Sequence, residues 1–147
     1  MAFEIRKMVR EDAERVASAM RTFYASPAVS TNGSEEIFRA DFEECVGPSP
    51  FATGFVFEEN GSFAGYGMLA FGYSTEFGAR CVWVEDIYVE EAFRGKGIAR
   101  EFLSRVRKEY PGHLLRLEVE KENAHAVHVY RKAGFEELPY SEMIQKP

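Results

Sequence analysis

The chain has 147 residues, of which 46% are hydrophobic and 29% charged, a composition typical of one globular domain with its own core. Its formal net charge of −6 argues against nucleic acid as a partner, because phosphate backbones are bound by clustered Lys and Arg. No apolar run approaches the roughly 18 residues of a membrane span, and no signal peptide is recognisable. The two cysteines, Cys45 and Cys81, suit a reducing compartment. We therefore expect a single cytoplasmic domain over 1–147 that does not bind membranes.

The first third of the chain predicts a strand and two helices. Residues 3–9 alternate in polarity as a strand does. Asp12 is the predicted N-cap of a helix that Pro27 ends, and Ser34 is the predicted N-cap of a second helix that ends at Gly47-Pro48. Their apolar stripes are Ala13, Val16, Met20, Phe23 and Tyr24 in the first, and Ile37, Phe38, Phe42 and Cys45 in the second.

A run of three strands follows. Residues 51–58 and 62–73 flank Asn60-Gly61, the dipeptide typical of a tight hairpin turn. The second of these strands contains three glycines that can mark a bulge, at Gly65, Gly67 and Gly72. Residues 79–89 form the third strand, and their nearly continuous apolar character indicates that both faces are covered.

The last third predicts further alternation of helix and strand. A helix over 98–110 is followed by a strand over 114–119 and a helix over 123–133, which Gly134 ends. Residues 135–144 are expected to supply one or two final strands. The order β-α-α-β-β-β-α-β-α-β(-β) predicts a mixed α/β fold in one domain.

The turn Arg94–Ala99, with the sequence RGKGIA, connects the third strand to the following helix. Unpaired N–H groups and the positive end of the dipole make a helix start an anion site, and glycines let the main chain approach the anion. The cations around this turn are Arg94, Lys96 and Arg100. A pyrophosphate fits this arrangement, although short loops also use glycine for turn geometry alone. The Walker pattern does not match, since Ile98 follows Gly97. The dinucleotide fingerprint does not match either, since Arg100 stands where its last glycine is needed and the turn lies late in the chain.

Two acids, Glu85 and Asp86, lie within the strand 79–89. Strict alternation places Trp83, Glu85, Ile87 and Val89 on one face, and Val82, Val84, Asp86 and Tyr88 on the other. A buried carboxylate is costly unless it is paired, protonated or functional. Two interpretations stay open: a salt bridge to an arginine of a neighbouring helix, or the floor of a pocket for a cationic amine.

Asn123 and Tyr130 lie seven residues apart and so share one helix face, about 10.5 Å apart at ~1.5 Å per residue. Asn123 is also a good N-cap, and Tyr130 can be an ordinary core residue with its hydroxyl at the surface. His125 and His128 are spaced as a metal pair, but no further ligands accompany them, so no metal site is predicted.

In their order along the chain, these features resemble the GCN5-related N-acetyltransferase (GNAT) family. The resemblance covers the whole element order, and its specific motifs lie in 82–135: an acid in a buried strand, the RGKGIA turn, then N-x-x-A-x-x-x-Y and A-G-F. The stretch WVEDIYVEEAFRGKGIA further resembles the diamine (spermidine/spermine) acetyltransferase branch. The resemblance implies a mostly antiparallel sheet flanked by helices.

The family resemblance also implies roles for matching positions, with acetyl-CoA as the acyl donor and no metal. The positions implied to bind the cofactor are Ile87, Tyr88, Val89, Arg94, Gly95, Lys96, Gly97, Ile98, Ala99, Arg100, Asn123 and Ala126. Tyr130 matches a tyrosine that protonates the leaving thiolate, and Glu85 matches a glutamate that holds and deprotonates the amine. Glu85, Asp86 and Tyr24 are the expected substrate-binding residues. The resemblance therefore implies that the acetyl group passes directly from acetyl-CoA to the amine while both are bound in a ternary complex.

The expected partner is a small, cationic primary amine, and a homodimer is possible for this family. Three other functions stay open. The acceptor can be an amine of a peptide or protein, the chain can sense acyl-CoA without turnover, or it can be an unrelated nucleotide-binding domain.

Overall fold

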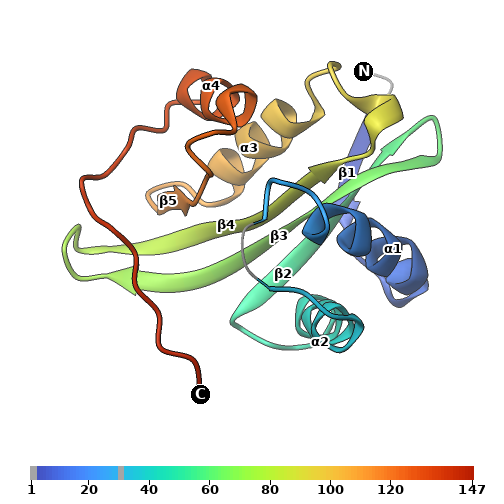
Figure 1. The fold of residues 1–147 in the computed structure, drawn as a ribbon, viewed down its shortest axis with the longest axis horizontal. Coiled ribbons are helices and arrows are strands. Elements are labelled where there is room, and N and C mark those ends of the chain that lie inside the picture. Colours follow the sequence, from blue (N-terminus) through green and yellow to red (C-terminus); the bar gives the residue numbers. More distant parts are fainter. Residues whose placement is uncertain (1–2, 30–31) are drawn as a thin grey trace.

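The computed structural model describes residues 3–29 and 32–147, which form a mixed sheet with helices on both faces (Figure 1). The strands lie side by side in the order β1-β2-β3-β4-β5, and all neighbours are antiparallel except β4 and β5. The elements are β1 (Phe3–Lys7), a 3-10 turn (Arg10–Asp12), α1 (Ala13–Tyr24), α2 (Glu35–Val46), β2 (Ala52–Glu59), β3 (Ser62–Ser74), β4 (Ala79–Val89), a second 3-10 turn (Glu91–Phe93), α3 (Ile98–Glu109), β5 (Leu114–Leu117) and α4 (Ala124–Lys132). The predicted fold class is confirmed.

The two N-terminal helices begin in different ways. The Ser34 hydroxyl accepts a hydrogen bond from the Ile37 amide at 3.2 Å, as an N-cap does, and this prediction is confirmed. Asp12 does hold the predicted N-cap position of α1, at the end of the 3-10 turn, but its side chain accepts no hydrogen bond from an α1 amide. Its carboxylate instead accepts from the Val9 amide at 2.8 Å and pairs with two arginines.

The β2–β3 hairpin turns at Asn60-Gly61, with φ angles of 51° and 81°. Two successive positive φ angles are the signature of the tight turn that the dipeptide predicts. The predicted bulge in β3 is also present, since Phe57 pairs with Gly65 while Glu58 pairs with Phe63. Gly65 is required here, because a Cβ added to it would lie 2.1 Å from the Tyr88 carbonyl oxygen.

A second bulge lies in β4, at Glu85. Met68 of β3 pairs with Asp86 and Leu69 pairs with Val84, so Glu85 is the extra residue between them. The bulge shifts the alternation of side chains by one position. The cluster under α3 consequently contains or contacts all four of the residues Val82, Val84, Ile87 and Val89. The prediction that Val82 and Val84 lie on the opposite face from Ile87 and Val89 is wrong.

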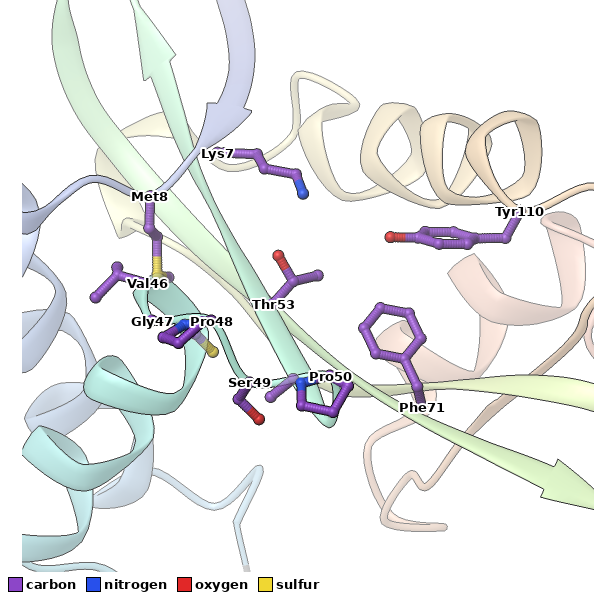
Figure 2. A pocket seen from close by; sticks show the side chains of 12 residues that line it. Lys7, Met8, Val46, Gly47, Pro48, Ser49, Pro50, Thr53, Phe71 and Tyr110 are labelled. Carbon is purple, nitrogen blue, oxygen red and sulfur yellow. The ribbon is translucent and has the colours of Figure 1, made fainter.

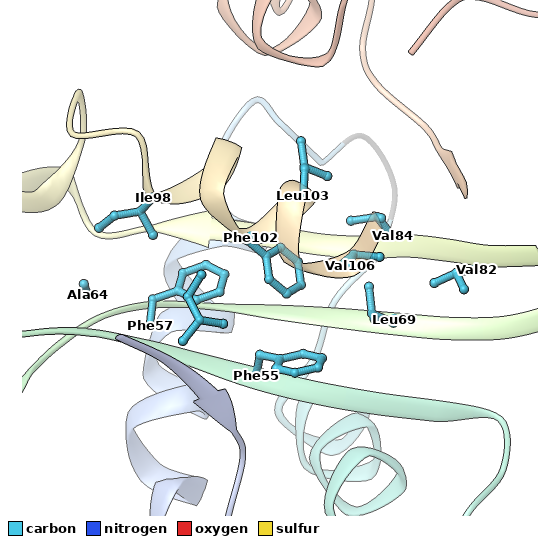
Figure 3. Close-up of a cluster of buried hydrophobic side chains, with 11 residues drawn as sticks. Phe55, Phe57, Ala64, Leu69, Val82, Val84, Ile98, Phe102, Leu103 and Val106 are labelled. Carbon is cyan, nitrogen blue, oxygen red and sulfur yellow. The ribbon is translucent and has the colours of Figure 1, made fainter. Parts of the chain in front are cut away.

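Apolar clusters fill both faces of the sheet. Under α3, Phe102 packs on Phe55 and Phe57 with ring centroids 5.5 and 5.0 Å apart (Figure 3). The opposite cluster joins the sheet to α1 and α2 through residues that include Met20 and Phe38. Because β4 is covered on both sides, its polar residues have little access to solvent unless they face a hollow.

The C-terminal residues 135–147 form no strand, and the prediction of one or two final strands there is wrong. They run as an extended segment past the end of the β3–β4 hairpin (Figure 1). Beyond Phe135, which packs against the cluster under α3, the apolar side chains are exposed, with Met143 91% and Ile144 71% exposed. Burial of apolar surface therefore contributes little to a strand here. One anchor is the Tyr140 hydroxyl, which donates to Glu76 at 2.6 Å. Within 3–29 and 32–147, no helix has the length and apolarity needed to cross a membrane.

Candidate functional site

The parallel strands β4 and β5 pair over only part of their length. Pairing runs from Cys81 opposite Leu114 to Val84 opposite Leu117, and β5 ends there. From the Glu85 bulge to Val89, β4 is paired with β3 but with no strand on its other side in the described part of the chain. Peptide groups along this open edge, which holds the predicted residues Ile87, Tyr88 and Val89, can pair with an extended ligand.

The RGKGIA turn lies directly after this open edge. Gly95 and Gly97 have φ angles of 79° and 84°, a conformation in which glycine is favoured. A Cβ added at either position would meet no atom within 4 Å, so the turn borders open space. Gly97 is the N-cap of α3 and provides no side-chain cap, which leaves the first helical amides for another acceptor. These residues fit a pyrophosphate group.

The three cations of the turn have different surroundings. The Lys96 ammonium pairs with Glu59 at 2.8 Å. The Arg94 guanidinium donates to the Val89 carbonyl at 2.8 Å and lies over the Tyr88 ring, so it braces the end of β4. Arg100 is exposed on the first turn of α3, and no ion pair involves it within the described ranges. Of the three, Arg100 is the cation best placed to meet an incoming anion.

Asp86 is the buried acid of β4, with 4% of its surface exposed. The Tyr24 hydroxyl of α1 donates to one carboxylate oxygen at 3.0 Å and the Tyr66 hydroxyl of β3 donates to the other at 2.7 Å. Burial raises the pKa of Asp86, although both hydroxyls act to lower it. The structure thus brings together Tyr24 and Asp86, two of the expected substrate-binding residues. Asp86 is held by two tyrosine hydroxyls and not by the arginine of the alternative salt bridge.

Glu85 and Asp41 extend the acidic character of this region. Glu85 is exposed at the bulge, and partial desolvation followed by the charges of Asp86, Glu142 and Asp41 raises its pKa. Asp41 of α2 is half-buried, and desolvation together with the Asp86 carboxylate raises its pKa to about 6. Sequence reasoning missed Asp41 and Tyr66. A signal for Asp41 existed, since it is an acid within the apolar stripe of the second predicted helix.

Tyr130 of α4 lies with the α3-side cluster that also holds Ile87 and Val89. Its ring meets Phe135 edge-on at 6.2 Å, and burial raises its pKa, so the hydroxyl is protonated at neutral pH. Tyr130 and Arg100 line one open cavity between α3, β5 and α4. The tyrosine is therefore placed on the side of β4 where its free edge begins.

Asn123 is the N-cap of α4, as predicted, because its side-chain oxygen accepts from the Ala126 amide at 3.2 Å. This bond fixes the start of the helix that carries Tyr130.

A second hollow lies where β1 ends, between α2 and the end of α3 (Figure 2). Lys7, Thr53, Phe71 and Tyr110 line it together with the loop that follows α2. None of the predicted site residues lines it. The predicted chemistry thus belongs to the region around the open edge of β4.

Comparison with known proteins gives one consistent result. Residues 15–135 match the Acetyltransferase (GNAT) family. Thialysine N-epsilon-acetyltransferase of Mus musculus is 33% identical over 145 residues, which cover 95% of this chain and 81% of the relative. The Sus scrofa enzyme of the same name is 32% identical over 149 residues, covering 94% and 80%.

Two solved structures have the same fold. Aminoglycoside N-acetyltransferase AAC(6')-Iy in complex with CoA superposes with a TM-score of 0.81 at 19% identity, covering 98% of this chain and 94% of that one. A possible acetyltransferase from Clostridium difficile 630 gives a TM-score of 0.80 at 17% identity, covering 100% and 99%.

Proposed function

Because the chain belongs to the GNAT family and is an N-acetyltransferase, we propose that it acetylates a primary amine of a small, cationic molecule by direct transfer from acetyl-CoA. The observation that carries this proposal is the pair Glu85 and Asp86, one exposed and one buried, beside the open edge of β4. Carboxylates without a cationic partner favour an ammonium as ligand.

The residues around the RGKGIA turn would hold the cofactor. Amides from Gly95 to Arg100 would bind the pyrophosphate, and the β4 edge at Ile87, Tyr88 and Val89 would pair with the extended arm. Asn123 and Ala126 would contact the cofactor from α4. When bound, acetyl-CoA supplies an acyl thioester to the site. The positive φ angles of the turn, the free α3 amides and the open edge support this placement.

Three groups of the chain would then perform the transfer. Glu85 accepts a proton from the ammonium, and its raised pKa makes it a better base than an ordinary glutamate. A main-chain N–H near Tyr88 or Val89 polarises the carbonyl that the amine attacks. Tyr130 donates its proton to the sulfur, for which its neutral hydroxyl is suited.

The acidic surroundings support a small cationic acceptor over a peptide. Asp41 belongs to α2, and Glu85 and Asp86 belong to β4. The Asp86 carboxylate contributes to the raised pKa of Asp41, and Asp41 has only partial and Asp86 little access to solvent. Relatives named for thialysine and aminoglycoside acetylation also act on small amines. A cytoplasmic location is part of the same proposal.

The direct test is thiol release from acetyl-CoA against a panel of diamines, polyamines, aminoglycosides, amino acids and short peptides. We expect turnover on one cationic class, and a loss of about 10- to 100-fold in kcat/KM on replacing Glu85 by Gln. In the wild type, kcat/KM should rise with pH across the raised pKa of Glu85, above the usual 4.5, because the base must be ionised to accept a proton.

The matched controls separate Glu85 from its surroundings. Glu4→Gln removes an exposed acid on β1 and should leave the profile unchanged. The pKa of Asp41 is also raised, to about 6, so the profile of Asp41→Asn identifies the contribution of Asp41. Tight CoA binding without turnover on any amine would replace this proposal with an acyl-CoA sensor.

The cofactor turn has a test of its own in Arg100→Gln. We expect the Kd for CoA to rise about tenfold, and to depend less on salt concentration, because one charge that meets the phosphates is removed. Arg80→Gln removes an exposed arginine at the opposite end of β4 and should leave the Kd unchanged. Isothermal titration calorimetry measures both. An equal rise in the Kd for CoA in both variants would show that the affinity depends on the net charge of the protein and not on the position of Arg100.

A further inference from the structure

The second hollow, at the end of β1, lies apart from the residues of the candidate site. β1 pairs with β2 only as far as Lys7 opposite Phe55, so β2 extends past the end of β1 towards Ala52. The loop after α2 and the end of α3 flank this part of β2, and the hollow between them has a volume of about 380 Å³ (Figure 2). Small-molecule sites commonly have volumes of about 300 to 1,000 Å³, so a small ligand fits here.

Three hydrogen-bond donors from different elements point into this hollow. Figure 2 shows the Lys7 ammonium, the Thr53 hydroxyl and the Tyr110 hydroxyl directed towards the same space. Lys7 ends β1, Thr53 belongs to β2, and Tyr110 is the C-cap of α3. Burial, followed by the charge of Glu109, raises the pKa of Tyr110, so its hydroxyl keeps its proton at neutral pH. The space between these groups therefore meets one positive charge and two hydroxyls.

Thr53 is the most enclosed of the three, with only 8% of its surface exposed. Within the described ranges its hydroxyl makes no hydrogen bond to another residue. No fully buried side-chain oxygen of the described residues lacks a partner, so the Thr53 oxygen reaches the hollow. Since an enclosed hydroxyl is costly without a partner, a polar ligand group at this point is favoured.

Lys7 brings a positive charge that no acid of the hollow neutralises. In the described part of the chain Lys7 forms no ion pair, and no Asp or Glu lines the hollow. Glu109, which precedes Tyr110 in the chain, is itself paired with Arg105 at 2.9 Å. The hollow thus carries one net positive charge in a protein of formal net charge −6, and the ligand that complements it is an anion.

Aromatic rings lie beside the three polar groups. The Phe71 ring packs on the Tyr110 ring with centroids 5.4 Å apart. Phe51 stands opposite Phe71, whose amide donates to the Phe51 carbonyl at 3.0 Å, and opposite residues of paired strands share a sheet face. Phe51 is 69% exposed, which leaves apolar surface next to the hollow. A ligand that matches both parts has a flat apolar body and an anionic end.

We propose that the second hollow binds a small aromatic carboxylate. The carboxylate accepts hydrogen bonds from Lys7, Thr53 and Tyr110, and the aromatic body lies on Phe71 and Phe51. One ammonium balances the single charge of a carboxylate, and the two hydroxyls supply further donors to its two oxygens. A phosphate group carries nearly two negative charges at neutral pH, of which one would stay unbalanced. This site is separate from the acetylation site and takes no part in the transfer step, so it stands independently of the proposed function.

The test is an amide NMR titration with phenylacetate in the presence of excess CoA, so that the anion site at the RGKGIA turn is already filled. We expect a Kd of about 1 mM, with shifts at the amides of Thr53, Phe71 and Tyr110. Phenylacetamide, which has the same ring and no charge, and inorganic phosphate should each bind at least about tenfold more weakly.

Two variants with matched controls locate the carboxylate. Lys7→Gln should raise the Kd for phenylacetate about tenfold, and Thr53→Val about fivefold, whereas Thr53→Ser keeps the hydroxyl and should bind as the wild type does. Lys146→Gln removes an exposed lysine near the C-terminus, changes the net charge equally and should leave the Kd unchanged.

Four results would overturn the proposal. They are no shifts at about 20 mM phenylacetate, phenylacetamide or phosphate binding as tightly as phenylacetate, equal Kd values in Lys7→Gln and Lys146→Gln, and shifts confined to the cavity between α3, β5 and α4. The comparison of phenylacetate with phenylacetamide uses only the wild type, so it decides the role of the carboxylate even if a variant fails to fold.

Discussion

Replacing Tyr130 by Phe should lower kcat about a hundredfold, because the variant lacks the hydroxyl that would protonate the leaving sulfur. Burial raises the pKa of Tyr130, so the hydroxyl carries its proton throughout the neutral range and can donate it. The Phe ring keeps the edge-on contact with Phe135 at 6.2 Å, so packing of α4 on the core is preserved. Steady-state thiol release should therefore show a loss in kcat with little change in KM or in the melting temperature.

Tyr110→Phe is the matched control for this prediction. Tyr110 is also partly buried with a raised pKa and packs against the same cluster under α3, but it lies at the C-terminal end of α3 and lines the second hollow (Figure 2). Its replacement should leave kcat unchanged. Full turnover in Tyr130→Phe would remove the general-acid role, and an equal loss in Tyr110→Phe would indicate an effect on packing.

Features that depend on a few neighbouring residues could be predicted from the sequence. The Asn60-Gly61 turn, the Ser34 and Asn123 caps and the glycine turn before α3 are all set by local backbone preferences. The glycines of that turn indicated an anion site because positive φ and bare amides are properties of the segment itself. Element order followed from the same local signals.

The bulge at Glu85 could not be predicted, because it depends on how β4 is paired with β3. The sequence of β4 alone shows a regular alternation, while the register places Val84 and Asp86 opposite consecutive residues of β3. This one inserted residue turns Ile87 and Val89 to the α3 side and leaves Glu85 exposed. The bulge thus sets the orientation of the candidate site.

Hydrogen bonds and ion pairs between residues far apart in the sequence could not be predicted either. The hydroxyls that hold Asp86 come from positions 62 and 20 residues away, and no local pattern links them. The strands expected over 135–144 do not form, because residues 135–147 bury too few apolar side chains. Asp12 was assigned to a cap because its type and place fitted, yet tertiary contacts with arginines decide its role.

Asp12→Asn should therefore destabilise the fold by about 3 kcal/mol, the range expected when one partner of a buried ion pair is removed. The Asp12 side chain is fully buried and lies 2.8 Å from Arg6 and 2.5 Å from Arg15. Although burial opposes its ionisation, hydrogen bonds from Arg6, the Val9 amide and Arg15 hold its pKa well below the usual range. Urea unfolding at neutral pH measures the loss. Glu43→Gln, which breaks the exposed pair with Arg10, should cost less than about 1 kcal/mol.

The dependence on pH distinguishes a charge effect from a packing effect. Since the folded pKa of Asp12 is depressed, its stabilisation is complete above the unfolded pKa of about 3.9 and is lost as the pH falls through the folded value. The gap in unfolding free energy between wild type and Asp12→Asn should therefore shrink by about 1 kcal/mol on going from neutral pH to about pH 3. A gap that stays constant over this range would mean that the shape of Asp12, and not its charge, joins the start of α1 to β1.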